Sequence, residues 1–116
     1  MALREEFLDS VVKCTDDELI HGLIISAGNT RFVENTGRGR KNVAEYTEEK
    51  EACKAEVIQR LENKGKATAE NLQLVEDLIA AKVEFVDALA AESGSDDLEA
   101  KKLVTQRCNA LLLILK

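Results

Sequence analysis

The sequence ends in five consecutive apolar residues, Leu111 to Leu115, followed by Lys116. Because an α-helix has about 3.6 residues per turn, such a run covers its whole circumference and leaves no polar face for water. We expect this end of the chain to lie in a core or at a subunit contact. The chain also contains no proline and only 3% aromatic residues, which favours helices over an aromatic-rich β-sheet. The sequence therefore predicts an all-α fold.

Composition narrows the class of protein. With 45% hydrophobic and 33% charged residues, residues 1–116 are enough for one globular domain. The net charge of −6 argues against a nucleic-acid partner and allows a basic protein partner. No apolar run approaches the ~20 residues that span a membrane. The first ten residues include Glu5, Glu6 and Asp9 and lack the apolar segment of a signal peptide, so we expect a cytoplasmic protein.

The three cysteines are too far apart for a metal motif. Cys14, Cys53 and Cys108 form no CxxC pair, and His21 is the only histidine, so a Cys/His zinc site cannot be completed. We predict no metal site and no cofactor. The cysteines are interpreted as small apolar side chains in a reducing compartment, with a redox role or an intermolecular disulfide as the alternative.

The N-terminal quarter of the chain predicts two helices and a loop. Residues 2–13 have an amphipathic pattern. Thr15 and Glu18 have the spacing of a capping box, which would begin a short second helix that stops near Gly28. Residues 1–27 are thus expected to form an N-terminal helical pair. Residues 28–42 contain Gly37, Gly39 and several turn formers and are predicted to be a loop.

Three long helices are predicted in residues 43–116. Asn42, Thr68 and Asp96 are the expected N-caps, and the helices are separated by Lys64-Gly65-Lys66 and Ser93-Gly94-Ser95. Short connectors make successive helices antiparallel. We therefore predict an antiparallel bundle in which these three long helices form an up-down-up unit and the N-terminal pair of shorter helices packs against it.

Three cations interrupt the apolar faces of these helices, namely Lys50, Lys82 and Arg107. Folding the chain about Gly65 and Gly94 brings them to a similar height, facing inward or toward a neighbouring subunit. Because burying an unpaired cation costs several kcal/mol, three interpretations stay open. The stems extend past the apolar layer to water, nearby carboxylates pair with the cations, or the three residues bind an anion such as a phosphate or nucleotide.

The predicted loop is basic within an acidic chain. Its cations outnumber Glu34 to give a local net charge of +3, and glycines would let its backbone approach a ligand closely. The GxxxxGK[ST] spacing of a P-loop is absent. The loop is a candidate partner-binding segment, and the alternative is a solvated loop whose cations meet the acidic helices. The candidate residues are Arg31, Arg38, Arg40 and Lys41.

An enzymatic alternative comes from a carboxylate pattern. Glu84-Phe85-Val86-Asp87 resembles the ExxD magnesium-binding element of all-α nucleoside-triphosphate pyrophosphohydrolases. Their EExxE element is incomplete here, because Ala52 follows Glu48-Glu49 where a glutamate is required. Nothing fixes a nucleophile beside His21. We therefore expect no enzymatic activity, with a magnesium-dependent pyrophosphohydrolase as an alternative.

Together these patterns predict a small acidic binding protein of the adaptor, inhibitor or antitoxin kind, which acts through helical faces and the basic loop. A protein partner and a homo-oligomer are expected. The runner-up is a binder that sequesters an anionic small molecule with Lys50, Lys82 or Arg107. The expected oligomer interface consists of Leu111, Leu112, Leu113 and Leu115.

Overall fold

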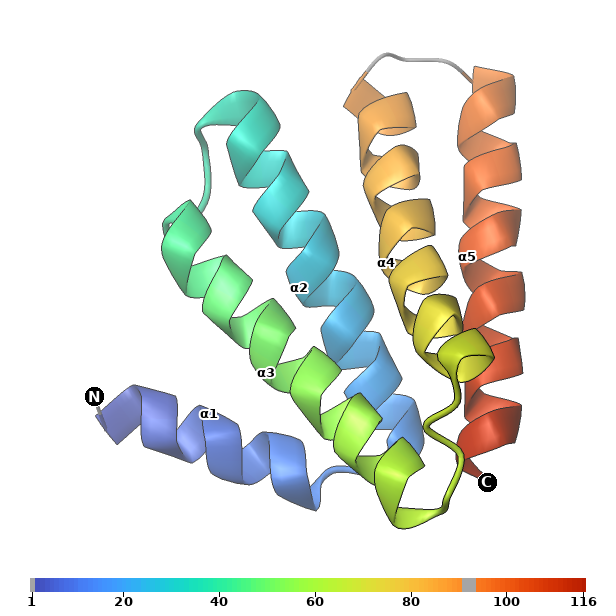
Figure 1. Ribbon diagram of the computed structural model, residues 1–116. Coiled ribbons are helices and arrows are strands. Elements are labelled where there is room, and N and C mark those ends of the chain that lie inside the picture. The colour runs from blue at the N-terminus through green and yellow to red at the C-terminus, as the bar shows by residue number, and fades with distance from the viewer. Residues whose placement is uncertain (1, 91–93) are drawn as a thin grey trace.

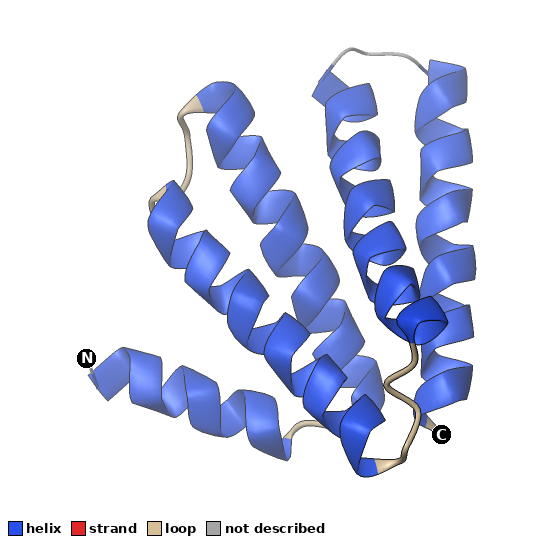
Figure 2. Ribbon diagram, in the orientation of Figure 1, coloured by secondary structure: helices blue, strands red, loops and turns tan. Residues whose placement is uncertain are grey.

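The structure is a computed structural model that describes residues 2–90 and 94–116, with side chains described for residues 5–90 and 98–116. In these residues the chain forms helices and no strand (Figures 1 and 2). This confirms the all-α prediction. No helix in the described ranges combines the length and apolar composition that crossing a membrane requires. The helices are α1 (Ala2–Lys13), α2 (Asp16–Thr36), α3 (Val43–Asn63), α4 (Ala69–Ala90) and α5 (Gly94–Leu115).

Side-chain caps begin three of the helices. At the start of α2, Thr15 accepts a hydrogen bond from the Glu18 backbone N–H at 3.2 Å, and the Glu18 carboxylate accepts one from the Thr15 N–H at 3.0 Å. The side chain of Asn42 likewise caps α3 by accepting a hydrogen bond from the Glu45 N–H, and that of Thr68 caps α4 by accepting one from the Asn71 N–H. These three predicted caps are confirmed. The predicted cap Asp96 is wrong, because α5 already begins at Gly94; Ser93 lies outside the described residues.

The predicted loop over residues 28–42 is wrong for its first nine residues. Helix α2 continues to Thr36 and ends at Gly37, whose φ of 68° suits glycine and whose N–H bonds to the Val33 carbonyl at 2.7 Å. Gly28 does not end the helix: it lies inside α2, where the stem of Lys82 passes over it. A Cβ there would lie 2.6 Å from Cε of Lys82. The connection to α3 therefore shrinks to residues 37–42.

Two antiparallel hairpins, α2–α3 and α4–α5, make up most of the molecule (Figure 1). Helix α2 packs against both α3 and α4, whereas α3 makes little backbone contact with α4. The predicted three-helix unit over residues 43–116 is thus corrected: α2 occupies the place beside α4 that was expected for α3. Helix α1 crosses α3 at the end of the molecule where the hairpins are joined.

The core is concentrated at this joined end. Its large fully buried side chains come from the N-terminal halves of α2 and α4 and from the C-terminal halves of α3 and α5. Away from this end the hairpins diverge (Figure 1), and partly exposed apolar residues replace buried ones. The largest fully buried side chains are Leu19, Ile20, Leu23, Val57, Leu61, Val75, Leu78, Leu111 and Leu115.

The C-terminal apolar run divides between core and surface. Leu111 and Leu115 are fully buried, Leu112 is partly buried, and Leu113 is 70% exposed. The expectation that this segment enters a core is therefore confirmed for Leu111 and Leu115. The chain's own helices therefore cover most of the run without a second subunit, and Leu113 is its one residue that faces solvent.

Arg60 attaches α1 to the rest of the fold. Its guanidinium bonds to Asp16 and Glu56, both at 2.8 Å, and to the backbone carbonyl of Cys14 at 2.7 Å. It also donates to the carbonyls of Val11 and Val12. These are among the last carbonyls of α1, which have no partner within that helix. One side chain on α3 therefore caps α1 and links it to the start of α2.

We predict that Arg60→Ala lowers the free energy of unfolding by roughly 1.5–3 kcal/mol, the range for hydrogen bonds to charged groups. Arg60→Lys should give an intermediate loss because an ammonium cannot span the same acceptors. Urea denaturation measures both, with the exposed Arg38→Ala as a control expected to stay within ~0.5 kcal/mol of the wild type. A loss for Arg60→Ala as small as that of the control would contradict the anchoring role.

Candidate binding groove

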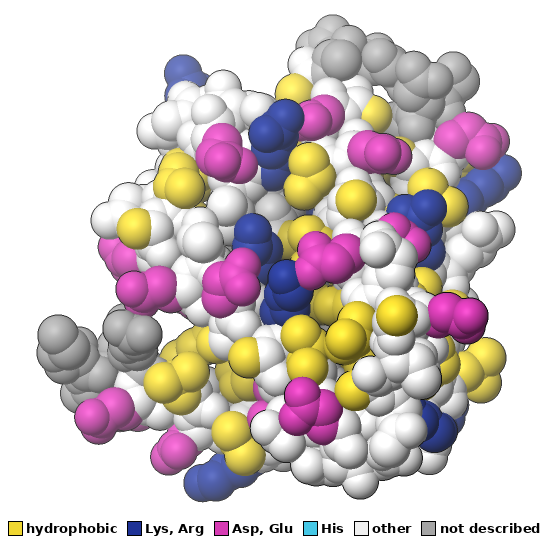
Figure 3. All heavy atoms as spheres, in the orientation of Figure 1, with side chains coloured by type: hydrophobic (Ala, Val, Ile, Leu, Met, Phe, Trp, Pro, Cys, Tyr) yellow, Lys and Arg dark blue, Asp and Glu magenta, His cyan; other side chains and the backbone are white. Residues whose placement is uncertain are grey.

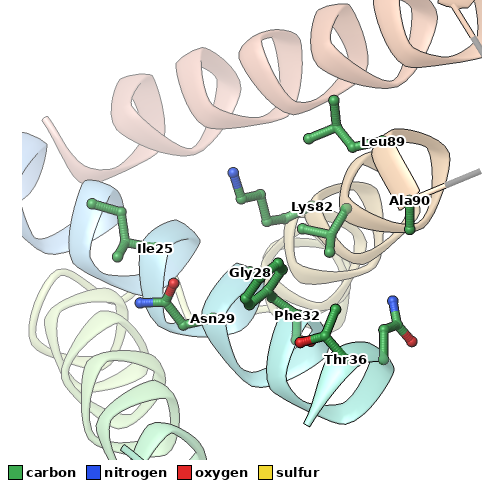
Figure 4. A pocket seen from close by; sticks show the side chains of 10 residues that line it. Ile25, Gly28, Asn29, Phe32, Thr36, Lys82, Leu89 and Ala90 are labelled. Carbon is green, nitrogen blue, oxygen red and sulfur yellow. The ribbon is translucent and has the colours of Figure 1, made fainter. Parts of the chain in front are cut away.

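A cavity of about 530 Å³ lies between α2 and α4 in the diverging half of the bundle (Figure 4). Its walls come from the C-terminal halves of the two helices, beyond the region where the core holds them together. We call it the α2–α4 groove. Its lining residues are Ile25, Gly28, Asn29, Phe32, Asn35, Thr36, Lys82, Val86, Leu89 and Ala90.

Three large apolar side chains of the groove are open to solvent. Ile25 is 43% exposed, Phe32 47% and Leu89 50%. Ile25 and Phe32 are two turns apart on α2, and Leu89 borders the same cavity from α4 (Figure 4). Exposed apolar residues that stand singly are ordinary, but their grouping around one cavity is typical of a binding site.

Lys82 is the cation of the groove. Its stem lies against Gly28 (Figure 4). Its ammonium stands 4.9 Å from the centroid of the Phe85 ring. Partial burial lowers the pKa of Lys82 from its ordinary value because the charged form has lost part of its hydration. Among the side chains that the structure describes, no carboxylate forms an ion pair with it.

A second cation in the same helix pair is neutralised. Arg31 makes a bidentate contact with Asp87, with N–O distances of 2.9 and 3.1 Å, and Asn35 donates to the same carboxylate at 2.9 Å. Hydrogen bonds from Arg31 and Asn35 hold the pKa of Asp87 below its usual value. Arg31, predicted to lie in a loop, is instead a helical residue that bridges α2 to α4, and its part in partner binding stays a prediction.

The three cations that the sequence placed at one height do not share the cavity. Of them, only Lys82 lines the groove. Arg107 donates to the backbone carbonyl of Asp77 at 2.7 Å, more than one turn before Lys82 on α4. Lys50 is partly buried on α3. The structure thus separates one candidate ligand-binding residue from the other two.

The basic loop that remains, residues 37–42, is partly neutralised. Lys41 pairs with Glu49 and stands over the Tyr46 ring, 5.9 Å from its centroid. Arg38 and Arg40 are exposed. The alternative interpretation of this segment, in which its cations meet acidic helices, therefore fits Arg31 and Lys41, while Arg38 and Arg40 keep free guanidinium groups among the described residues.

Charged side chains alternate along the middle of the face shown in Figure 3. An ion pair between Lys54 and Glu76 joins α3 to α4. A further cavity of about 470 Å³ between α4 and α5 is bordered by Glu84, Glu99 and Lys102. Both regions mix charges of the two signs, and the second cavity is lined by none of the strongly exposed large apolar residues.

The described side chains provide no metal site of three or more His, Cys, Asp or Glu residues. In the partial pyrophosphohydrolase pattern, Asp87 is bound to Arg31 and Glu49 to Lys41, and Glu84 is exposed. The three cysteines are free thiols. Burial raises the pKa of Cys53 to about 11, which makes this thiol a weak nucleophile at neutral pH.

Comparisons with protein-family models, curated proteins and solved structures find no match for this chain. Its function has to be argued from the groove itself. Sequence reasoning found Lys82 but missed Ile25, Phe32 and Leu89. The sequence pattern that could have identified them is apolar residues at helical spacing. For Ile25 and Phe32 that pattern is visible only if α2 is expected to continue through Gly28.

The Arg31–Asp87 bridge predicts an acid-dependent loss of stability. Because the folded state lowers the pKa of Asp87, its contribution is present above the ordinary aspartate pKa of about 3.9 and disappears as the pH falls through the lower folded value. The stability difference between wild type and Asp87→Asn should therefore shrink as the pH falls from 7 to 2. Chemical denaturation at each pH measures this, with the exposed Glu84→Gln as control. A difference that is constant with pH would contradict the bridge.

Proposed function

We propose that this protein is a non-enzymatic binding module that receives an amphipathic helix of a partner protein in the α2–α4 groove. The observation that carries the proposal is the group of exposed apolar side chains, Ile25, Phe32 and Leu89, around a cavity between two helices. Helix-in-groove recognition uses such a surface, with anchors one and two turns apart on the ligand. Adaptors, inhibitors and antitoxins all fit this mode of binding.

The dimensions of the groove support a helical occupant. From Ile25 to Thr36 the α2 wall spans twelve residues, and its two ends are about 16 Å apart at a rise of ~1.5 Å per residue. This matches about three turns of a bound helix. A partner helix bound there would pack against α2 and α4, which are packed together by the core at the other end of the two hairpins. Binding would then remove the exposed apolar side chains from water, which is favourable for association.

Other exposed apolar residues support the choice of this groove less well. Leu8 and Val12 lie on α1, and Leu98 and Leu113 lie on α5, but none of them lines a described cavity. The expected homo-oligomer stays a prediction, as do the cytoplasmic location and a contribution of Arg38 and Arg40 to partner contact.

A small anionic molecule is the second candidate for the same groove. Its volume of about 530 Å³ is within the roughly 300–1,000 Å³ of small-molecule sites, and Lys82 could meet a negative group. The observation that favours a protein partner is that the three anchors are nearly half exposed, which suits an elongated ligand better than an enclosed one.

Disrupting the groove should abolish helix binding without unfolding the protein. We predict that a display library of 16-residue helical peptides yields ligands that bind the wild type and lose at least tenfold in affinity for Phe32→Asp and for Leu89→Asp, because each change puts a charge in the apolar wall. Leu113→Asp is the matched control, exposed and outside the groove, and should bind as the wild type does. Fluorescence anisotropy measures the affinities.

Ligands that bind all four proteins equally would remove the α2–α4 groove as the site. Thermal melts of each variant identify any that fail to fold. Binding of phosphate or nucleotides alone, with loss in Phe32→Asp and Leu89→Asp and no peptide ligand, would support the small-molecule candidate instead.

A further inference from the structure

The α2–α4 helix pair contains two cations in different states. Arg31 is saturated by Asp87, with Asn35 on the same carboxylate. Lys82, one to two turns earlier on α4 than Asp87, has an aromatic ring as its described electrostatic partner. An ammonium has three donors and no acceptor. Within the described side chains, the groove therefore presents hydrogen-bond donors that the fold itself does not use.

The position of Lys82 is held by its neighbours. Gly28 has no side chain, and this lets the lysine stem pass directly over α2, since a Cβ at Gly28 would come within 2.6 Å of Cε. The Phe85 ring lies next to the ammonium at 4.9 Å. A lysine on an open surface would move among many rotamers, whereas this one extends along the groove with less conformational entropy left to lose on binding.

We propose that Lys82 selects the partner by its charge: the helix that docks in the groove presents an aspartate or glutamate to the Lys82 ammonium. This inference rests on the proposed function and adds to it the chemistry of the partner. Once the helix is bound, it and the apolar walls exclude water around the contact, which strengthens a charge-assisted hydrogen bond relative to one in solvent. An ammonium that has already lost hydration also has less water left to shed when the carboxylate arrives.

The geometry of α4 also fixes the spacing in the ligand. Lys82 and Leu89 are seven residues apart on one helix, or about 10 Å at ~1.5 Å per residue, with Val86 one turn from Lys82. A ligand helix that lies along α4 should therefore have its acidic residue about two turns from the apolar anchor that meets Leu89. A smaller apolar residue should lie between them, opposite Val86.

The experiment is a parallel selection from the helical display library on wild type, Lys82→Met and Lys50→Met. Lys82→Met keeps the stem and removes the charge, and Lys50→Met removes the charge of another partly buried lysine that does not line the groove. We expect wild type and Lys50→Met to enrich Asp or Glu two turns from an apolar anchor. Lys82→Met should enrich the same apolar anchors without the acidic residue.

A matched pair of selected peptides, differing only by Glu or Gln at that position, quantifies the effect. The Glu peptide should bind the wild type about tenfold more tightly, and the two should bind Lys82→Met within about twofold. Gly28→Ala, which has a higher helix propensity, should displace the Lys82 stem and also reduce the ratio. Calorimetry measures each affinity.

The outcomes separate the two proposals. Peptides that depend on Phe32 and Leu89 but bind the wild type equally well as Glu and Gln forms would overturn the role of Lys82 and leave the groove in place. A Glu preference that persists in Lys82→Met would overturn that role too. The absence of any peptide that depends on Phe32 and Leu89 would overturn the proposed function together with this inference.

Discussion

The rest of the structure depends on a core that occupies one end of two helical hairpins. Leu19 and Leu23 of α2, Leu78 of α4, and Leu111 and Leu115 of α5 are buried together there. This packing fixes α2 beside α4 and sets the direction of both hairpins. At the other end the hairpins diverge (Figure 1), so the Arg31–Asp87 bridge is a main polar connection between α2 and α4. The α2–α4 groove follows from this uneven distribution of apolar side chains.

The groove combines features that conflict with maximal stability. Filling it from within would need burial of Phe32 and Leu89, whereas the chain leaves both apolar residues about half exposed. Lys82 adds a partly desolvated ammonium whose pKa is lowered. Functional sites are where proteins retain such locally unfavourable choices. Arg60 shows the opposite case, with its donors used by Asp16, Glu56 and the end of α1.

The sequence predicted the local features well and the long-range features poorly. Thr15, Asn42 and Thr68 marked helix starts because capping is a local interaction between residues three apart. Gly28 misled the prediction, because a glycine often ends a helix, whereas here it lies within α2 beneath the stem of Lys82, which is 54 residues away in the chain. The extension of α2 then changed which helix stands beside α4. Pairing of Arg31 with Asp87, likewise, is a contact that no local pattern reveals.

Methyl NMR of the protein with a selected helical peptide shows whether the α2–α4 groove is the binding surface. The methyl resonances of Ile25, Val86 and Leu89 should shift on titration, while those of Leu61 in the core and Leu113 on α5 should not. Shifts centred on Leu8 and Val12 of α1, with Ile25 and Leu89 unchanged, would contradict binding in the groove and place the binding surface on α1 instead.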